Sequence, residues 1–86
     1  MIEAIRRRVI RVIAETLEIP VQTLSPETRI KADLGADSMQ IVTIMIGLDE
    51  EFDVEFKVDQ LPTGEVTIDG IVNFVTVTVE AARVTH

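Results

Sequence analysis

The stretch Asp33-Leu34-Gly35-Ala36-Asp37-Ser38-Met39-Gln40 is a polar turn that leads straight into an apolar segment, Ile41 to Phe52. Asp37 stands where a helix N-cap belongs, because its carboxylate can accept an unpaired backbone N–H of the first turn. Gln40 follows three residues later, which is the spacing of a capping box. These positions predict a helix that begins at Ser38. The Ser38 hydroxyl should point outward beside the positive end of this helix, where an attached anion would be stabilised.

The composition indicates one small acidic domain. The chain has 86 residues, so we expect a single domain over residues 1–86. Its net charge of -7 argues against nucleic-acid binding, since phosphates repel an acidic surface. No apolar run approaches the ~20 residues of a membrane span. No unbroken apolar segment follows the N-terminal arginines either. We therefore expect no signal peptide, no stable membrane insertion and a cytoplasmic location.

The side chains that most enzymes and metal sites need are missing. There is no cysteine, which excludes a disulfide, a thiolate nucleophile and a Cys-based metal site. The single histidine is the terminal His86, so no Ser-His-Asp or Cys-His arrangement can form. The acids between Asp49 and Asp59 lack the EF-hand pattern, and they serve either solubility or the attraction of basic partners. We expect no metal site, and we expect that the chain is not an enzyme.

Apolar residues at helical spacing predict a first helix from Ile2 to Leu17, which Pro20 ends. The arginines on its other face could suggest binding to a membrane surface, but the core needs the apolar stripe. A long loop, residues 19–36, follows, and Ser25-Pro26-Glu27 predicts a single helical turn within it. Four apolar residues should anchor this loop to the core: Val21, Leu24, Ile30 and Leu34.

The second predicted helix, from Ser38 to about Phe52, is apolar around well over half of its circumference. Such a helix is either a central core helix or one that also binds an apolar surface. Gly47 in its middle costs up to ~1 kcal/mol against alanine. That cost indicates the close approach of either a neighbouring helix or a partner protein, and the sequence leaves both open.

The C-terminal segment carries two conflicting patterns. Thr67 can cap a helix that starts at Ile68, and apolar residues continue at helical spacing to Val79. The alternation in Val75-Thr76-Val77-Thr78-Val79 instead favours a strand. No comparable second strand exists, and a lone strand would leave its backbone groups unpaired. We therefore predict a helix here.

Motif, spacing, length and charge together resemble the acyl carrier protein family. The family's Asp-Ser-Leu signature reads Asp37-Ser38-Met39, and its Leu-Gly-x-Asp element reads Leu34-Gly35-Ala36-Asp37. Its Glu-Glu-Phe element reads Glu50-Glu51-Phe52. The resemblance extends from Ile2 to about Ala82. It implies an all-α four-helix bundle with three longer helices, a short one near residues 58–61, and a long loop between the first two helices.

The resemblance also implies a 4'-phosphopantetheine arm on Ser38, attached from coenzyme A by a phosphopantetheinyl transferase. Asp37 would cap the helix and be recognised by the transferase, and Met39 would complete the motif. The arm's thiol would carry an acyl group as a thioester, which fits the absence of cysteine, and the tether would raise the cargo's local concentration at partner active sites. The acyl chain would shelter between the helices, among Met45, Ile46 and Leu48.

We expect partner enzymes to bind the polar stripe of the second helix, which consists of Gln40, Thr43, Gly47, Glu50 and Glu51. Housekeeping carriers of fatty-acid synthesis have acids in place of Gln40 and Thr43. The loss of both charges indicates a specialised, monomeric carrier for a dedicated pathway of fatty-acid, lipid or polyketide synthesis. Its partners would be the transferase and enzymes that load and process acyl groups.

Two other functions stay open on the sequence. One is a peptidyl or aminoacyl carrier, although the free-standing length and the acidity favour the acyl type. The other is a helical interaction module that binds through its second helix and carries no prosthetic group. Incubation with coenzyme A and a promiscuous transferase would separate a carrier from such a module.

Overall fold

The computed structural model describes residues 2–56 and 66–84, and every regular element in them is helical. The elements are α1 (Ile2–Leu17), the 3-10 turn η1 (Val21–Thr23), α2 (Ser38–Phe52) and α3 (Ile68–Val84). An all-α fold is therefore confirmed for the described residues. The short helix expected near residues 58–61, which would complete a four-helix bundle, lies outside them.

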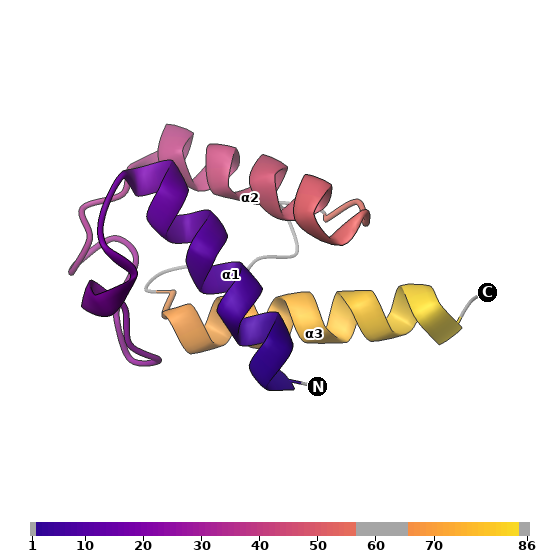
Figure 1. The fold of residues 1–86 in the computed structure, drawn as a ribbon. Coiled ribbons are helices and arrows are strands. Elements are labelled where there is room, and N and C mark those ends of the chain that lie inside the picture. The colour runs from indigo at the N-terminus through magenta and orange to yellow at the C-terminus, as the bar shows by residue number, and fades with distance from the viewer. Residues whose placement is uncertain (1, 57–65, 85–86) are drawn as a thin grey trace.

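The helix α1 packs against both of the other long helices (Figure 1). In this view it runs diagonally in front, from beside the start of α2 down across the first part of α3. The largest fully buried side chains come from all three helices and from the loop before α2: Val9, Ile13, Ile30, Ile44, Leu48, Ile68, Val72 and Val75. The helix α2 therefore lies at the edge of the fold, with one face in the core and the opposite face in solvent.

The end of α1 is fixed by backbone geometry ahead of Pro20. Glu18 adopts a left-handed conformation with a φ of 56°. The amide of Ile19 then donates to the carbonyl of Ala14 at 3.0 Å, which is the long hydrogen bond of a Schellman motif. Pro20 follows, and it cannot continue a helix. The predicted first helix is confirmed.

The long loop between α1 and α2 is held by the residues just before α3. The amide of Ile30 donates to the carbonyl of Val66 at 2.8 Å, and the amide of Ile68 donates to the carbonyl of Thr28 at 2.9 Å. Leu24 and Ile30 are buried and Leu34 is half-buried, as predicted. The loop is thus attached to the body of the fold along its length.

Two predictions for this loop are wrong. The side chain of Val21 is 47% exposed, so it does not anchor the loop. The helical turn is at Val21–Thr23, directly after Pro20, whereas Ser25-Pro26-Glu27 belongs to a turn closed by a hydrogen bond from Thr28 N to Ser25 O. Pro20 and Pro26 both fix a φ angle that suits the start of a helical turn. The prediction placed the turn at Pro26, whereas the structure has it after Pro20.

The conflict in the C-terminal segment is resolved in favour of a helix. Thr67 caps α3, since its Oγ1 accepts from the amide of Gly70 at 3.0 Å. The β-branched run is accommodated because Thr76 donates its hydroxyl to Val72 O at 2.8 Å, and Thr78 donates to Phe74 O at 2.9 Å. The valine side chains on the inner face pack into the core, and this burial outweighs the local preference for a strand.

Candidate functional site

Asp37 and Gln40 form a complete capping box at the start of α2. Asp37 Oδ1 accepts from the amide of Gln40 at 2.9 Å, and Gln40 Oε1 accepts from the amide of Asp37 at 3.1 Å. The predicted cap is confirmed, and α2 begins at Ser38. The amides of Ser38 and Met39 have no carbonyl partner within the helix. The positive end of the helix dipole is therefore open beside the Ser38 side chain.

Ser38 differs from the other serine of the chain in its hydrogen bonding. Ser25 is held in the loop, where its Oγ shares a hydrogen bond of 2.9 Å with Thr28 Oγ1. The side chain of Ser38 is exposed, and its hydroxyl makes no hydrogen bond with any residue that the structure describes. A group attached to Ser38 would meet solvent and free helix amides, and it would break no hydrogen bond among residues 2–56 and 66–84.

The turn that leads to Ser38 is fixed by Gly35 and Asp33. Gly35 has a φ of 69°, a left-handed conformation that glycine adopts at little cost, and its amide donates to the carbonyl of Lys31 at 3.0 Å. The Asp33 carboxylate accepts from the amide of Arg29 at 2.8 Å, with a second, longer contact to the Arg29 guanidinium at 3.5 Å. These hydrogen bonds hold the pKa of Asp33 below its ordinary value.

The outer face of α2 carries large apolar side chains in solvent. Met39 is 76% exposed, Val42 41% and Ile46 54%, and their spacing places them in one row along the helix. Thr43 and Glu50 are exposed on the same face. The Thr43 hydroxyl is used within the helix, donating to Met39 O at 2.9 Å. We define these five residues as the outer face of α2.

Gly47 does not belong to this outer face, because it packs against α1. A Cβ atom added at residue 47 would lie 2.9 Å from Cγ1 of Val12. The sequence left two reasons for a glycine at this position, and the close approach of a neighbouring helix is the one that the structure supports.

Glu51 is also turned toward α1. Its Oε2 accepts from Arg8 Nε at 2.7 Å and from Arg11 Nη2 at 2.8 Å, and only 20% of its side chain is exposed. The Arg8 guanidinium lies 4.3 Å from the ring centroid of Phe52. The hydrogen bond from Arg8, followed by that from Arg11, lowers the pKa of Glu51. Sequence reasoning missed this cluster because its members are some 40 residues apart and nothing local marks them.

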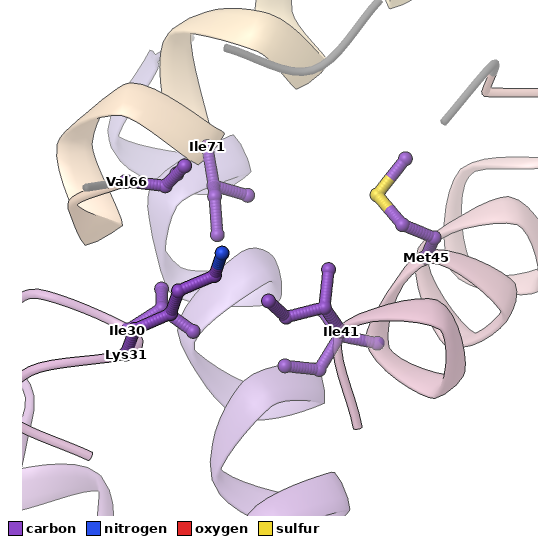
Figure 2. Close-up of a pocket in the computed structure, with 7 residues that line it drawn as sticks. Ile30, Lys31, Ile41, Met45, Val66 and Ile71 are labelled. Carbon is purple, nitrogen blue, oxygen red and sulfur yellow. The ribbon is translucent and has the colours of Figure 1, made fainter. Parts of the chain in front are cut away.

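An apolar cavity of about 20 Å³ lies beside α2 (Figure 2). Its lining comes from the loop before α2, from α2, from α3 and from one residue just ahead of α3. These residues are Ile30, Lys31, Ile41, Ile44, Met45, Ile71 and Val66. Of the three residues expected to shelter a cargo, only Met45 lines this cavity. Ile46 lies on the outer face of α2, and Leu48 is fully buried in the core.

Within residues 2–56 and 66–84, no three acidic or histidine side chains come together as a metal site. The acids near the end of α2 have other partners, since Glu51 binds two arginines and Asp49 accepts from the amide of Phe56 at 2.9 Å. None of the described helices is long and apolar enough to span a bilayer.

A comparison with protein families agrees with the geometry around Ser38. The family described as "Phosphopantetheine attachment site" matches residues 7–75, most of the chain, and the matched range includes Asp37, Ser38 and the whole of α2. This match is consistent with the acyl carrier protein family, as the sequence motifs predicted. The chain therefore belongs to the phosphopantetheine-attachment family, whose domains carry a covalently bound 4'-phosphopantetheine.

Proposed function

We propose that the chain is an acyl carrier protein, in which Ser38 Oγ holds the 4'-phosphopantetheine arm and the arm's thiol carries acyl groups as thioesters. The main support is the exposed hydroxyl of Ser38 at the start of α2, which bonds to none of the described residues and lies inside the range that matches the family. In this proposal a phosphopantetheinyl transferase supplies the arm from coenzyme A. The chain itself catalyses no reaction and presents the cargo to other enzymes.

The residues around Ser38 suit a phosphodiester. The Ser38 and Met39 amides and the helix dipole favour an anion at this end of α2. The Asp37 carboxylate is engaged with the amide of Gln40, which fixes where the helix starts and hence where the Ser38 side chain points. Asp37 would in addition be recognised by the transferase.

The outer face of α2 is the surface we propose for partner enzymes, together with Gln40 beside it. It begins one residue after the attachment site and combines exposed apolar side chains with the carboxylate of Glu50. Gly47 and Glu51, which the sequence also suggested for partner binding, contact α1, so we give them a weaker part in this surface. We further propose a monomer in the cytoplasm.

The apolar lining of the cavity favours an acyl cargo over an aminoacyl one, because the free ammonium group of an aminoacyl thioester would gain nothing from the aliphatic walls. The net charge of -7 is also in keeping with the acyl type. The cargo would come from fatty-acid, lipid or polyketide synthesis. The missing acids at Gln40 and Thr43 support a dedicated pathway over general fatty-acid synthesis.

The test is incubation with coenzyme A and a promiscuous phosphopantetheinyl transferase, followed by mass spectrometry of the intact protein. The parent should gain the mass of one phosphopantetheine. Ser38→Ala should gain nothing, while Ser25→Ala, which changes the only other serine, should be modified like the parent. An unmodified parent would contradict the carrier function and leave the interaction module as the better explanation.

A further inference from the structure

A groove of about 680 Å³ lies on the solvent side of α1, next to the turn η1. Its lining consists of five residues of α1 and one of η1: Ala4, Arg7, Arg8, Ile10, Arg11 and Val21. Binding sites for ligands have volumes of about 300–1,000 Å³, so the groove is large enough to take several side chains of a partner. The core-facing side of α1, with Val9 and Ile13, takes no part in the lining. A partner could therefore occupy the groove without disturbing the core.

The groove is positively charged, although the whole chain has a net charge of -7. Arg7 is exposed, and its side chain forms no ion pair or hydrogen bond with a described residue. Arg8 and Arg11 share the single carboxylate of Glu51, and their side chains are still 45% and 55% exposed. None of the described acidic residues lines the groove. Positive charge is therefore left over for an anion from outside the molecule.

The groove also has an apolar part between these cations. Val21 is 47% exposed and Ile10 is half-buried, and both line the groove. The exposure of Val21 has no explanation in the packing of the core, which this residue does not join. Arginines around a partly apolar centre are typical of surfaces that bind proteins. The two kinds of side chain together fit a ligand that combines carboxylates with an aliphatic group.

We propose that this groove binds an acidic segment of a partner protein. Carboxylates of the segment pair with Arg7 and Arg11, and an aliphatic side chain between them covers Val21. The concave shape favours a peptide segment over an anionic bilayer, which is flat and would leave the groove unfilled. A bilayer would also meet the acidic surface of the rest of the chain, whereas a segment of a few residues stays within the positive patch.

This docking site is separate from the attachment site. None of the residues that line the groove belongs to α2. Glu51, which holds Arg8 and Arg11, follows Ser38 by 13 residues, or about 20 Å along the helix axis. A protein bound to α1 can thus hold the chain while other enzymes reach Ser38 and the outer face of α2. The binding itself needs no arm, but this use of it rests on the proposed carrier function.

The experiment titrates the full chain with two synthetic peptides that have blocked ends. One consists of repeated Glu-Glu-Leu units, and the other has Gln-Gln-Leu units and hence the same apolar side chains without charge. Binding is followed through the backbone amide resonances. The acidic peptide should shift Arg7, Ile10 and Val21 and leave Met39 and Val42 in place. Its affinity should exceed that of the neutral peptide by about fivefold or more, as expected for several exposed ion pairs.

Three variants test the two parts of the groove. Arg7→Gln removes a cation that has no described partner, and it should weaken the acidic peptide about threefold, the effect of one exposed ion pair. Lys31→Gln is the matched control, because Lys31 is also an exposed cation but does not line the groove, and it should keep the parent affinity. Val21→Ser should weaken both peptides, since it removes the apolar contact that they share.

Equal affinity for both peptides would overturn the inference, as would equal losses in Arg7→Gln and Lys31→Gln, which would indicate an effect of net charge alone. It would also be overturned if the chain bound vesicles of phosphatidylglycerol through Arg7 and failed to bind the acidic peptide. The titration uses the chain without its arm. A failure of docking is therefore distinct from a failure of the carrier function, which would be seen as a chain that gains no phosphopantetheine.

Discussion

Gly47 of α2 and Val12 of α1 touch so closely that the Cβ atom of any larger residue at position 47 would lie 2.9 Å from Val12 Cγ1. Val12 is buried and β-branched, so it cannot easily turn away. Gly47→Ala should therefore destabilise the protein by about 1–3 kcal/mol, the range for overpacking. Without the contact, the helix propensity of alanine would have stabilised it.

A double-mutant cycle measured by urea denaturation tests this contact. Val12→Ala removes the methyl group that clashes, so Gly47→Ala should cost much less in that background than in the parent, and the two changes should not be additive. If the two changes in the free energy of unfolding simply add, the added methyl group at residue 47 is accommodated by movements that do not involve Val12.

Glu51 should stabilise the fold in a pH-dependent way. Its carboxylate pairs with Arg8 and Arg11 only in the folded state, and its pKa there lies below the ordinary 4.5. A carboxyl group with a lowered folded pKa contributes stability that is present above 4.5 and is lost as the pH falls through the folded value.

At neutral pH, Glu51→Gln should cost about 1 kcal/mol in the free energy of unfolding. This difference from the parent should shrink as the pH is lowered below 4.5. Glu50→Gln is the control, because Glu50 is exposed and its side chain forms no ion pair with any described residue. An equal effect of both substitutions would contradict a specific role for Glu51.

Asp37 is predicted to cap α2 and to be recognised by the transferase, and a substitution by asparagine can separate these two roles. Asp37→Ala should cost about 1 kcal/mol through the lost cap and should slow modification. Asparagine caps a helix about as well as aspartate, so Asp37→Asn should keep the stability of the parent. If the transferase recognises the carboxylate, Asp37→Asn should still be modified slowly. Modification at the parent rate would show that only the cap matters.

The charge on the outer face of α2 should govern the choice of partner. Gln40→Glu combined with Thr43→Glu restores two acids. Glutamate at position 40 can keep the hydrogen bond from the Asp37 amide, which the shorter side chain of aspartate would not reach as well. General fatty-acid synthase enzymes should then load or process the carrier faster, with a gain that shrinks as salt screens the charges. Full activity of the parent with those enzymes, unchanged by the substitutions, would contradict a specialised carrier.

The start of α2 could be predicted in detail from the sequence because its interactions are local. The capping box joins residues three apart, and Asp37 and Gln40 have the side chains that this spacing requires. Gly35 lies in the turn that was predicted before it, and the helices were predicted from two strongly periodic segments and a third, capped one. In these cases the residues that determine the structure are neighbours in the chain.

The surroundings of Gly47, Glu51 and Lys31 could not be predicted, because their neighbours are distant in sequence. Val12 precedes Gly47 by 35 residues, and the cavity beside Lys31 exists only when α3 closes it through Ile71. The local pattern of Val75–Val79 favours a strand, but a helix was predicted there and is found. Backbone hydrogen bonding and packing in the core determine the helix.

The Ser38 hydroxyl takes no part in the hydrogen bonds of the described fold. Folding of the chain therefore does not depend on attachment of the arm, which makes the carrier active. The chain without its arm should fold to the same structure as the chain with it, and the arm's phosphate should add to stability only through the helix dipole. Modification can then precede or follow folding, and a pool of folded, inactive carrier can persist until coenzyme A is available. Protein quality control, which acts on unfolded chains, would have no means of telling the two forms apart.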